Sequence, residues 1–287
     1  MSTARTRAAV RSRTLGPGSR PGKSGLRCDD VPSLTVEYSG REMRTALRCG
    51  GETLWSGPWE IEIRSGGRRV EPASRWEEVC WLSADGVQCV ELEGQFGEGI
   101  RVQRLLLSAW EDRFVLLADA IFAPSAAELD YCARLPLGES IRFAAAGESW
   151  EGILRKRGRR ALVLPLGLPE WRDAPAAGAL VETTSGLELR QAVHGRALWT
   201  PMFVDLDVQR IRRKRTWRAL TVVQDLQALP PDVAVGYRVL VGSRQWLIYR
   251  SLAAKANRSV LGHNLSTEML VARFQRKGQV ESIMEIE

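Results

Sequence analysis

Apolar and polar residues alternate along most of this chain in short runs. Between residues 233 and 241, valine or tyrosine occupies every second position, which is the two-residue period of a strand with one buried face. Similar runs continue from Leu34 to the C-terminus, separated by Gly, Pro, Asp and Asn. This spacing is typical of antiparallel sheets packed face to face. We therefore predict an all-β protein, a large antiparallel β-sandwich of the super-sandwich type with about seventeen strands.

The first 27 residues differ from the rest in composition. They are rich in Arg, Ser, Gly and Pro and have no apolar period, so we predict a disordered basic tail over residues 1–27 and one β-sandwich domain over residues 28–287. An Arg-rich leader without acidic residues can also be an organelle transit peptide or a nucleic-acid-binding arm. The tail lacks the apolar core of a secretory signal, and no later segment is long enough to span a membrane, so we expect a cytoplasmic protein.

The net charge of +7 comes from this tail. Seven of the 41 basic residues lie within residues 1–27, which contain no acidic residue, so the remaining 34 basic residues match the 34 acidic ones. Because the body is electrically balanced, nucleic acid is an unlikely partner for it. The 44% of apolar residues suffices for a sizeable core.

Residues 100–123 predict a hairpin with an internal ion pair. If Glu111 and Asp112 form the centre of the turn, Arg104 lies directly opposite Asp119 on a face that is otherwise apolar. A buried carboxylate needs a charged partner, so we interpret Arg104 and Asp119 as a structural ion pair.

Residues 125–137 allow a helix by their capping-box spacing, but their alternation favours a strand.

The five cysteines have no C-x-x-C spacing, which argues against a zinc site or a disulfide framework. A four-residue turn from Ser83 to Gly86 would place Cys80 opposite Cys89, and we expect both thiols to be reduced. We expect no metal and no cofactor.

The densest group of uncommon polar residues lies between residues 245 and 264. Tyr249, His263 and Asn264 are the residue types that a polysaccharide lyase uses to neutralise a uronate and move a proton. The alternative is a polar loop whose side chains bond to backbone in turns. The same region holds three further residues suited to ligand binding: Arg250, Asn257 and Arg258.

Two basic runs, residues 155–160 and 210–215, occur where turns are expected. Each is either a solvated hairpin tip or part of a patch for an anionic polymer. Ten tryptophans are many for this length, but most lie within apolar alternation, so we expect most of them in the core.

Four segments carry a resemblance to known proteins: LLLSAWEDRFVLLADAI (105–121), the Trp217-Arg218 pair, GSRQWLIYRSL (242–252) and NRSVLGHNL (257–265). Together they resemble a group of uncharacterised bacterial proteins. The hairpin is more distantly similar to one in the C-terminal β-sandwich of heparinase II/III-like polysaccharide lyases. In that family the sandwich is joined to an α-helical toroid on which the active site depends, and this sequence predicts no helical half.

We therefore expect a non-catalytic binding or structural module with polysaccharide as the leading ligand class. One alternative is a lyase-like enzyme that uses the 245–264 region. The other is a nucleic-acid binder that uses its basic tail and loops. The sequence does not predict an oligomeric state.

Overall fold

The computed structural model describes residues 10–16, 31–173, 177–275 and 279–287. These residues form 25 strands, two 3-10 turns and no α-helix, so the all-β prediction is confirmed. The count exceeds the predicted seventeen partly because five strands are only two or three residues long. Within this part of the chain no helix could cross a lipid bilayer.

The strands form four antiparallel sheets. The first sheet contains β1 (Arg11–Leu15), β2 (Ser33–Ser39), β3 (Glu42–Cys49) and β4 (Glu52–Pro58). The largest, which we call the central sheet, contains β5 (Glu60–Ser65), β6 (Arg68–Val70), β7 (Glu77–Ala84), β8 (Val87–Gln95), β9 (Arg101–Ala109), β10 (Phe114–Leu135), β11 (Arg142–Ala145), β12 (Gly152–Arg155), β13 (Arg159–Pro165), β14 (Gly178–Thr183), β15 (Gly186–Trp199) and β16 (Met202–Asp205).

The remaining strands form two smaller sheets. The five-stranded sheet contains β17 (Arg215–Leu220), β20 (Ala234–Val241), β21 (Arg244–Ser251), β24 (Met269–Phe274) and β25 (Val280–Ile286). The small sheet contains β18 (Val222–Gln224), β19 (Gln227–Ala228), β22 (Arg258–Val260) and β23 (His263–Leu265). The two 3-10 turns are η2 (Gly97–Gly99) and η3 (Arg210–Arg212).

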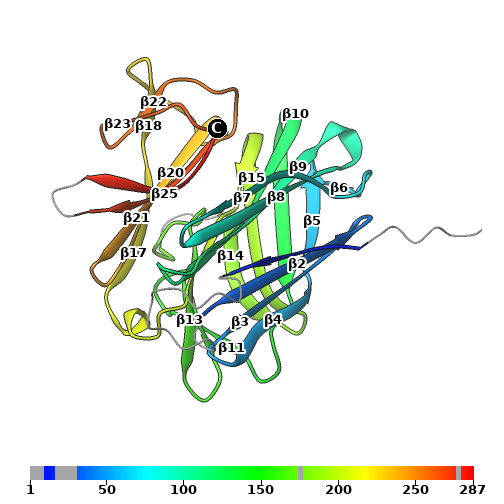
Figure 1. Ribbon diagram of the computed structural model, residues 1–287. Coiled ribbons are helices and arrows are strands. Elements are labelled where there is room, and N and C mark those ends of the chain that lie inside the picture. The colour runs from blue at the N-terminus through cyan, green and yellow to red at the C-terminus, as the bar shows by residue number, and fades with distance from the viewer. Residues whose placement is uncertain (1–9, 17–30, 174–176, 276–278) are drawn as a thin grey trace, which may run out of the picture.

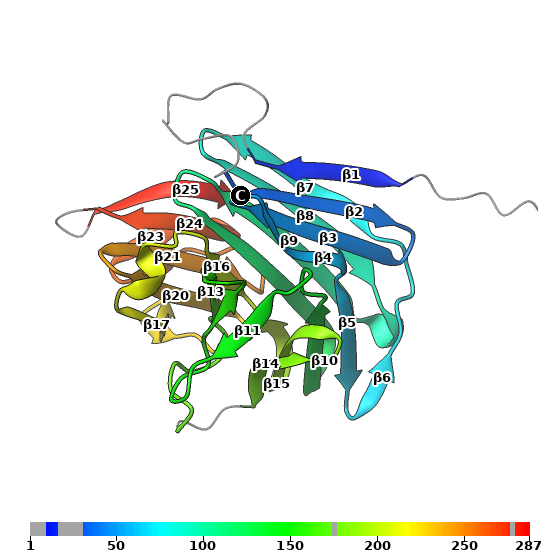
Figure 2. The same cartoon turned by 90° about the horizontal axis from the view of Figure 1, so that it is seen from below.

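The central sheet is buried on both faces over β8, β9 and the first part of β10. Leu106 packs on one face against the first sheet, whereas Leu105 and Leu107 pack on the other face against the five-stranded sheet. A third core lies between the five-stranded and small sheets. The green and cyan strands therefore lie between the blue strands and the yellow-to-red ones (Figures 1 and 2). A strand buried on both faces has a continuous apolar run rather than an alternating one, which explains residues 105–107.

The hairpin β9–β10 has the register expected from a turn centred on Glu111 and Asp112. Arg104 lies opposite Asp119, and both side chains are fully buried. The guanidinium donates from Nε to Asp119 Oδ1 over 2.7 Å and from Nη2 to Oδ2 over 2.8 Å. It also donates to the Trp59 carbonyl over 2.8 Å, and the Tyr131 hydroxyl donates to Asp119 Oδ2.

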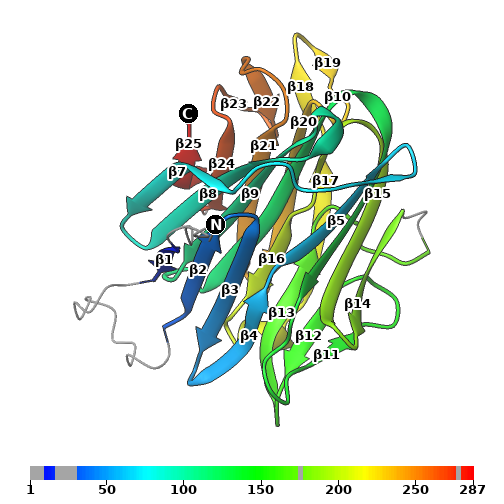
Figure 3. The ribbon, with the colours of Figure 1, turned by 90° about the vertical axis from the view of Figure 1, so that its right-hand side faces the viewer.

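Residues 125–135 continue β10, so the strand interpretation is confirmed over helix there. The ladder with β15 shifts between Phe122 and Ala127. Beyond this shift β10 lies between β5 and β15, and Figure 3 shows these three strands side by side.

Two expectations need correction. The predicted disorder of residues 1–27 is wrong for residues 11–15, which form β1: Leu15 is fully buried, and Arg13 donates to Glu78 over 2.7 and 2.9 Å. Residues 1–9 and 17–27 lie outside the described part of the chain.

The cysteine hairpin is the second correction. The turn after β7 is centred on Asp85 and Gly86, one residue later than a turn from Ser83 to Gly86 would be, so Cys89 lies opposite Leu82 and Cys80 opposite Glu91. Both thiols are free. Burial raises the pKa of each, which keeps them protonated at neutral pH.

Candidate functional site

The residues proposed for catalysis differ in their exposure. Tyr249 on β21 is fully buried, and its hydroxyl accepts a hydrogen bond from Arg258 Nη1 over 3.2 Å. His263 on β23 is half-buried, and Asn264 is exposed. These three side chains line none of the hollows described below.

Of the residues proposed for ligand binding, Arg258 has a structural role in the core. Arg258 is buried and donates to Ser251 Oγ over 2.6 Å and to the Ala254 carbonyl over 2.9 Å. Its Nε also donates to Gln224 Oε1 over 3.3 Å, so its four partners tie β22 to β21, to β18 and to the loop between β21 and β22. Asn257, by contrast, is exposed in that loop.

Arg250 joins two layers of the protein. It extends from β21 to the central sheet, where Nη2 lies 2.8 Å from Glu91 Oε1 on β8 and 2.6 Å from Gln103 Oε1 on β9. Arg250 is 2% exposed, so it offers no surface to a ligand. Burial raises the pKa of Glu91, and the charge of Arg250 opposes that rise.

A hollow on the surface lies where the two basic runs meet. One part, about 650 Å³ in volume, is lined by the β12–β13 turn at Gly158 and Arg160 and by the η3 segment at Gln209, Arg212 and Arg213. An adjoining part of about 500 Å³ shares Gln209 and Arg213. It adds further residues: Asp207, Arg210, Lys214, Gly242 and Ser243. We call the two parts together the basic groove.

The charges of the basic groove divide into anchored and unpaired groups. Arg210 is anchored, since it donates to Asp205 over 2.8 and 3.0 Å and to the Asp112 carbonyl, and this holds η3 in place. Arg160 lies 3.7 Å from Glu52. Arg212, Arg213 and Lys214 are exposed, and no ion pair links them to other described residues. The groove therefore presents three uncompensated positive charges.

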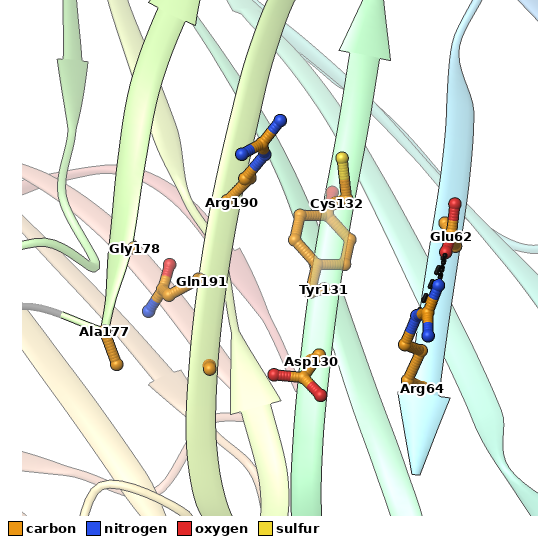
Figure 4. Close-up of a pocket in the computed structure, with 10 residues that line it drawn as sticks. Glu62, Arg64, Asp130, Tyr131, Cys132, Ala177, Gly178, Arg190 and Gln191 are labelled. Atoms are coloured by element: carbon orange, nitrogen blue, oxygen red, sulfur yellow. Dashed lines mark hydrogen bonds and ion pairs between the residues drawn. The ribbon is translucent and has the colours of Figure 1, made fainter. Parts of the chain in front are cut away.

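A smaller pocket of about 270 Å³ lies on the outer face of the central sheet where β5, β10, β14 and β15 run together (Figure 4). Its charged side chains are of both signs: Glu62, Arg64, Asp130 and Arg190. Arg64 pairs with Glu62 at 3.1 Å and Arg190 with Glu188 at 2.5 Å. Because these charges cancel locally, the pocket has no marked preference for an anion or a cation.

The thiol of Cys132 also lines this pocket. Burial raises its pKa, so the thiol is protonated and weakly nucleophilic at neutral pH. Within the described residues, no group of three or more His, Cys, Asp or Glu side chains is placed to hold a metal ion.

No family model matches the chain, and no curated protein matches its sequence. Solved structures do match the fold. A heparinase III gene product aligns with a TM-score of 0.53 and 7% identity over 77% of this chain and 39% of its own length. A mutant of the heparan sulfate lyase HepC from Pedobacter heparinus aligns with a TM-score of 0.53 and 8% identity over 79% of this chain and 40% of its own. The fold is thus similar to part of a heparinase III, and the chain spans about 40% of the length of these proteins.

Both basic runs were recognised in the sequence, but the sequence did not predict that they lie side by side in the folded protein. The runs are about 50 residues apart, and only the topology brings the β12–β13 turn against η3. Gln209 and the Gly242-Ser243 turn, which complete the groove, carry no signal in the sequence by which they could have been found.

Proposed function

We propose that this protein is a non-catalytic module that binds an acidic polysaccharide through the basic groove. The observation that carries the proposal is the convergence of two distant basic runs into one hollow, in which Arg212, Arg213 and Lys214 have no acidic partner among the described residues. Unpaired guanidinium groups suit carboxylate and sulfate because they donate two parallel hydrogen bonds.

The fold supports a polysaccharide as the ligand class. The solved structures with a similar fold are named as a heparinase and a heparan sulfate lyase. Stacking on tryptophan offers little surface for a sugar, because six of the ten tryptophans are buried and only Trp171 is exposed among the described residues, at 46%. We therefore assign binding to the arginines.

A non-catalytic role fits the 245–264 region. A lyase base needs to reach the substrate, whereas Tyr249 is sealed in the core and bonded to Arg258. His263 and Asn264 lie on β23 of the small sheet, outside the basic groove. The lyase-like alternative therefore draws no support from this geometry.

The test is binding to heparin as a function of salt. The double variant Arg212→Ser/Arg213→Ser should elute from immobilised heparin at lower salt, and the slope of log K against log [salt] should fall by about two, roughly one per lost contact. The matched control is Arg44→Ser/Arg48→Ser, which removes two exposed charges from β3. Equal losses in both double variants would mean that net charge, not the groove, causes retention.

A second measurement separates polysaccharide from nucleic acid. Single-stranded DNA and heparin of similar total charge are titrated under the same conditions. We expect tighter binding of heparin by the wild-type protein, together with a greater loss on substitution of Arg212 and Arg213. Tighter binding of DNA would instead support the alternative that the basic groove binds nucleic acid.

A further inference from the structure

The pocket on the outer face of the central sheet is a second place where a ligand can bind. It is the pocket of Figure 4, about 270 Å³ in volume, where β5, β10, β14 and β15 run together, and we call it the sheet-face pocket. None of the described residues lines both this pocket and the basic groove. Arg64, Asp130 and Arg190 are exposed, so a ligand can reach all three from solvent.

Small residues form the floor of the sheet-face pocket beside Asp130. Ala192 on β15 lies directly opposite Asp130 on β10, and residues directly opposite each other have their side chains on the same face of a sheet. The Ala192 amide donates to the carbonyl of Ala177 over 2.6 Å, next to Gly178 at the start of β14. All three small residues line the pocket. Open space therefore remains over the sheet next to the Asp130 carboxylate.

Asp130 is the charged lining residue that the protein leaves unpaired. Glu62 pairs with Arg64 at 3.1 Å, and Arg190 pairs with Glu188 at 2.5 Å. Arg64 lies directly opposite Asp130 on β5, yet its guanidinium contacts Glu62 instead (Figure 4). The Asp130 side chain forms no hydrogen bond or ion pair within the described part of the chain. Its exposed carboxylate is thus available to an ammonium group.

The positive charge of the sheet-face pocket lies at Arg190. Arg134 Nε donates to Glu188 over 2.7 Å, and Arg190 Nη2 lies 2.5 Å from the same carboxylate. Two guanidinium groups thus share one carboxylate, which leaves an excess of one positive charge among these three contacting groups. The Arg190 side chain is 60% exposed, and a guanidinium has five N–H donors, so donors remain for a ligand carboxylate.

We propose that the sheet-face pocket binds a free α-amino acid as a zwitterion, with its ammonium group on Asp130 and its carboxylate on Arg190. Arg190 lies opposite Cys132, two residues along β10 from Asp130, so the two charged residues are diagonal neighbours, about 7–8 Å apart at the backbone. In an α-amino acid one carbon atom separates the two charged groups, and charge-assisted hydrogen bonds of about 2.7–2.9 Å at each end bridge the remaining distance.

The size and the charge of the sheet-face pocket both fit this ligand. Its volume is below the roughly 300–1,000 Å³ typical of sites for drug-sized molecules, which suits one amino acid, whose side chain would lie over Ala192 and Ala177. The charges of the pocket cancel in sum, and a zwitterion is likewise neutral in sum while it carries one charge of each sign. This site goes beyond the proposed function and does not depend on the basic groove.

The experiment measures binding of L-leucine and L-phenylalanine by saturation-transfer NMR and titration. We expect at least one of them to bind the wild-type protein. Asp130→Asn keeps the shape of the side chain and removes its charge, and it should weaken binding about tenfold or more, the loss expected for a hydrogen bond to a charged group. Ala192→Leu fills the floor without a change of charge and should abolish binding.

Analogues that lack one charged group test the zwitterion itself. They are 3-methylbutylamine and 4-methylpentanoate for leucine, and 2-phenylethylamine and 3-phenylpropanoate for phenylalanine. Each should bind at least about tenfold more weakly than its parent amino acid. An amine that binds as tightly as the amino acid would overturn the role of Arg190, and an acid that does so would overturn the role of Asp130.

The matched control is Asp85→Asn, which removes an exposed carboxylate in the β7–β8 turn, outside the sheet-face pocket. It should leave amino-acid binding unchanged. The proposal would be overturned if the wild-type protein bound neither amino acid, or if Asp130→Asn and Ala192→Leu bound as the wild type does. Retention on heparin should be the same in Asp130→Asn and Asp85→Asn, so this site and the basic groove can fail separately.

Discussion

Removing both members of the Arg104–Asp119 pair should destabilise the protein by less than the sum of the two single removals. Arg104→Met leaves the Asp119 carboxylate fully buried with only the Tyr131 hydroxyl as a side-chain donor. Asp119→Leu leaves a buried guanidinium whose remaining oxygen acceptor is the Trp59 carbonyl. Breaking a buried pair from one side costs about 3–5 kcal/mol, a large share of the roughly 5–15 kcal/mol that stabilises a typical domain.

The double variant Arg104→Met/Asp119→Leu removes both charges and their desolvation together. It still leaves the Tyr131 hydroxyl and the Trp59 carbonyl without these partners, at about 1–3 kcal/mol each. We therefore expect the double variant to lose less free energy of unfolding than the sum of the two single variants, with a coupling of about 3 kcal/mol.

The assay is urea unfolding of the four proteins, read from midpoints at a common m-value. The exposed pair Arg75–Glu77, at 3.1 Å with side chains 72% and 62% exposed, provides the control cycle, where the coupling should stay below about 1 kcal/mol. Additive losses at Arg104 and Asp119 would refute the reasoning, because they would show that the two charges stabilise the fold independently.

Two further predictions concern the contacts between layers and the edge strand β1. Arg250→Met should lower the free energy of unfolding by about 3–5 kcal/mol, because Glu91 is left buried without its partner. The folded variant should bind heparin as the wild-type protein does. A loss of heparin binding without a loss of stability would show instead that Arg250 binds the ligand. Glu78→Gln should destabilise the protein near neutral pH. The hydrogen bond from Arg13 lowers the pKa of Glu78, so its contribution is present above its ordinary value of about 4.5 and is lost as pH falls through the lower folded value. The difference in thermal midpoint between Glu78→Gln and wild type should shrink as the pH falls below about 4, and a constant difference would contradict this account.

Local patterns were sufficient to predict the sheet content and one hairpin register. The alternation of residues 233–241 is the pattern of β20, whose alternate side chains enter the core. The turn at Glu111 and Asp112 sets the register that places Arg104 opposite Asp119. Both features depend on neighbours in sequence, so a strand period and a turn suffice to predict them. The same reasoning was wrong for Cys80 and Cys89, because the turn is centred one residue further along the chain, which shifts the whole pairing.

The layering and the candidate sites depend on contacts between residues far apart in the chain. The sequence did not predict that Arg250 would extend across to Glu91, because an arginine in a strand has the same pattern whether its face meets solvent or another sheet. Tyr249 is buried for the same reason, since the small sheet covers its face of β21.

The sequence by itself therefore determined that this chain forms sheets, where most of its strands run, and that an ion pair belongs inside the β9–β10 hairpin. Only the tertiary structure decided that β8, β9 and the first part of β10 are covered on both faces, and that the runs at 155–160 and 210–215 meet in one groove. The physical reason is that strand period and turn chemistry act over a few residues, whereas the stacking of sheets is decided by which faces exclude water together.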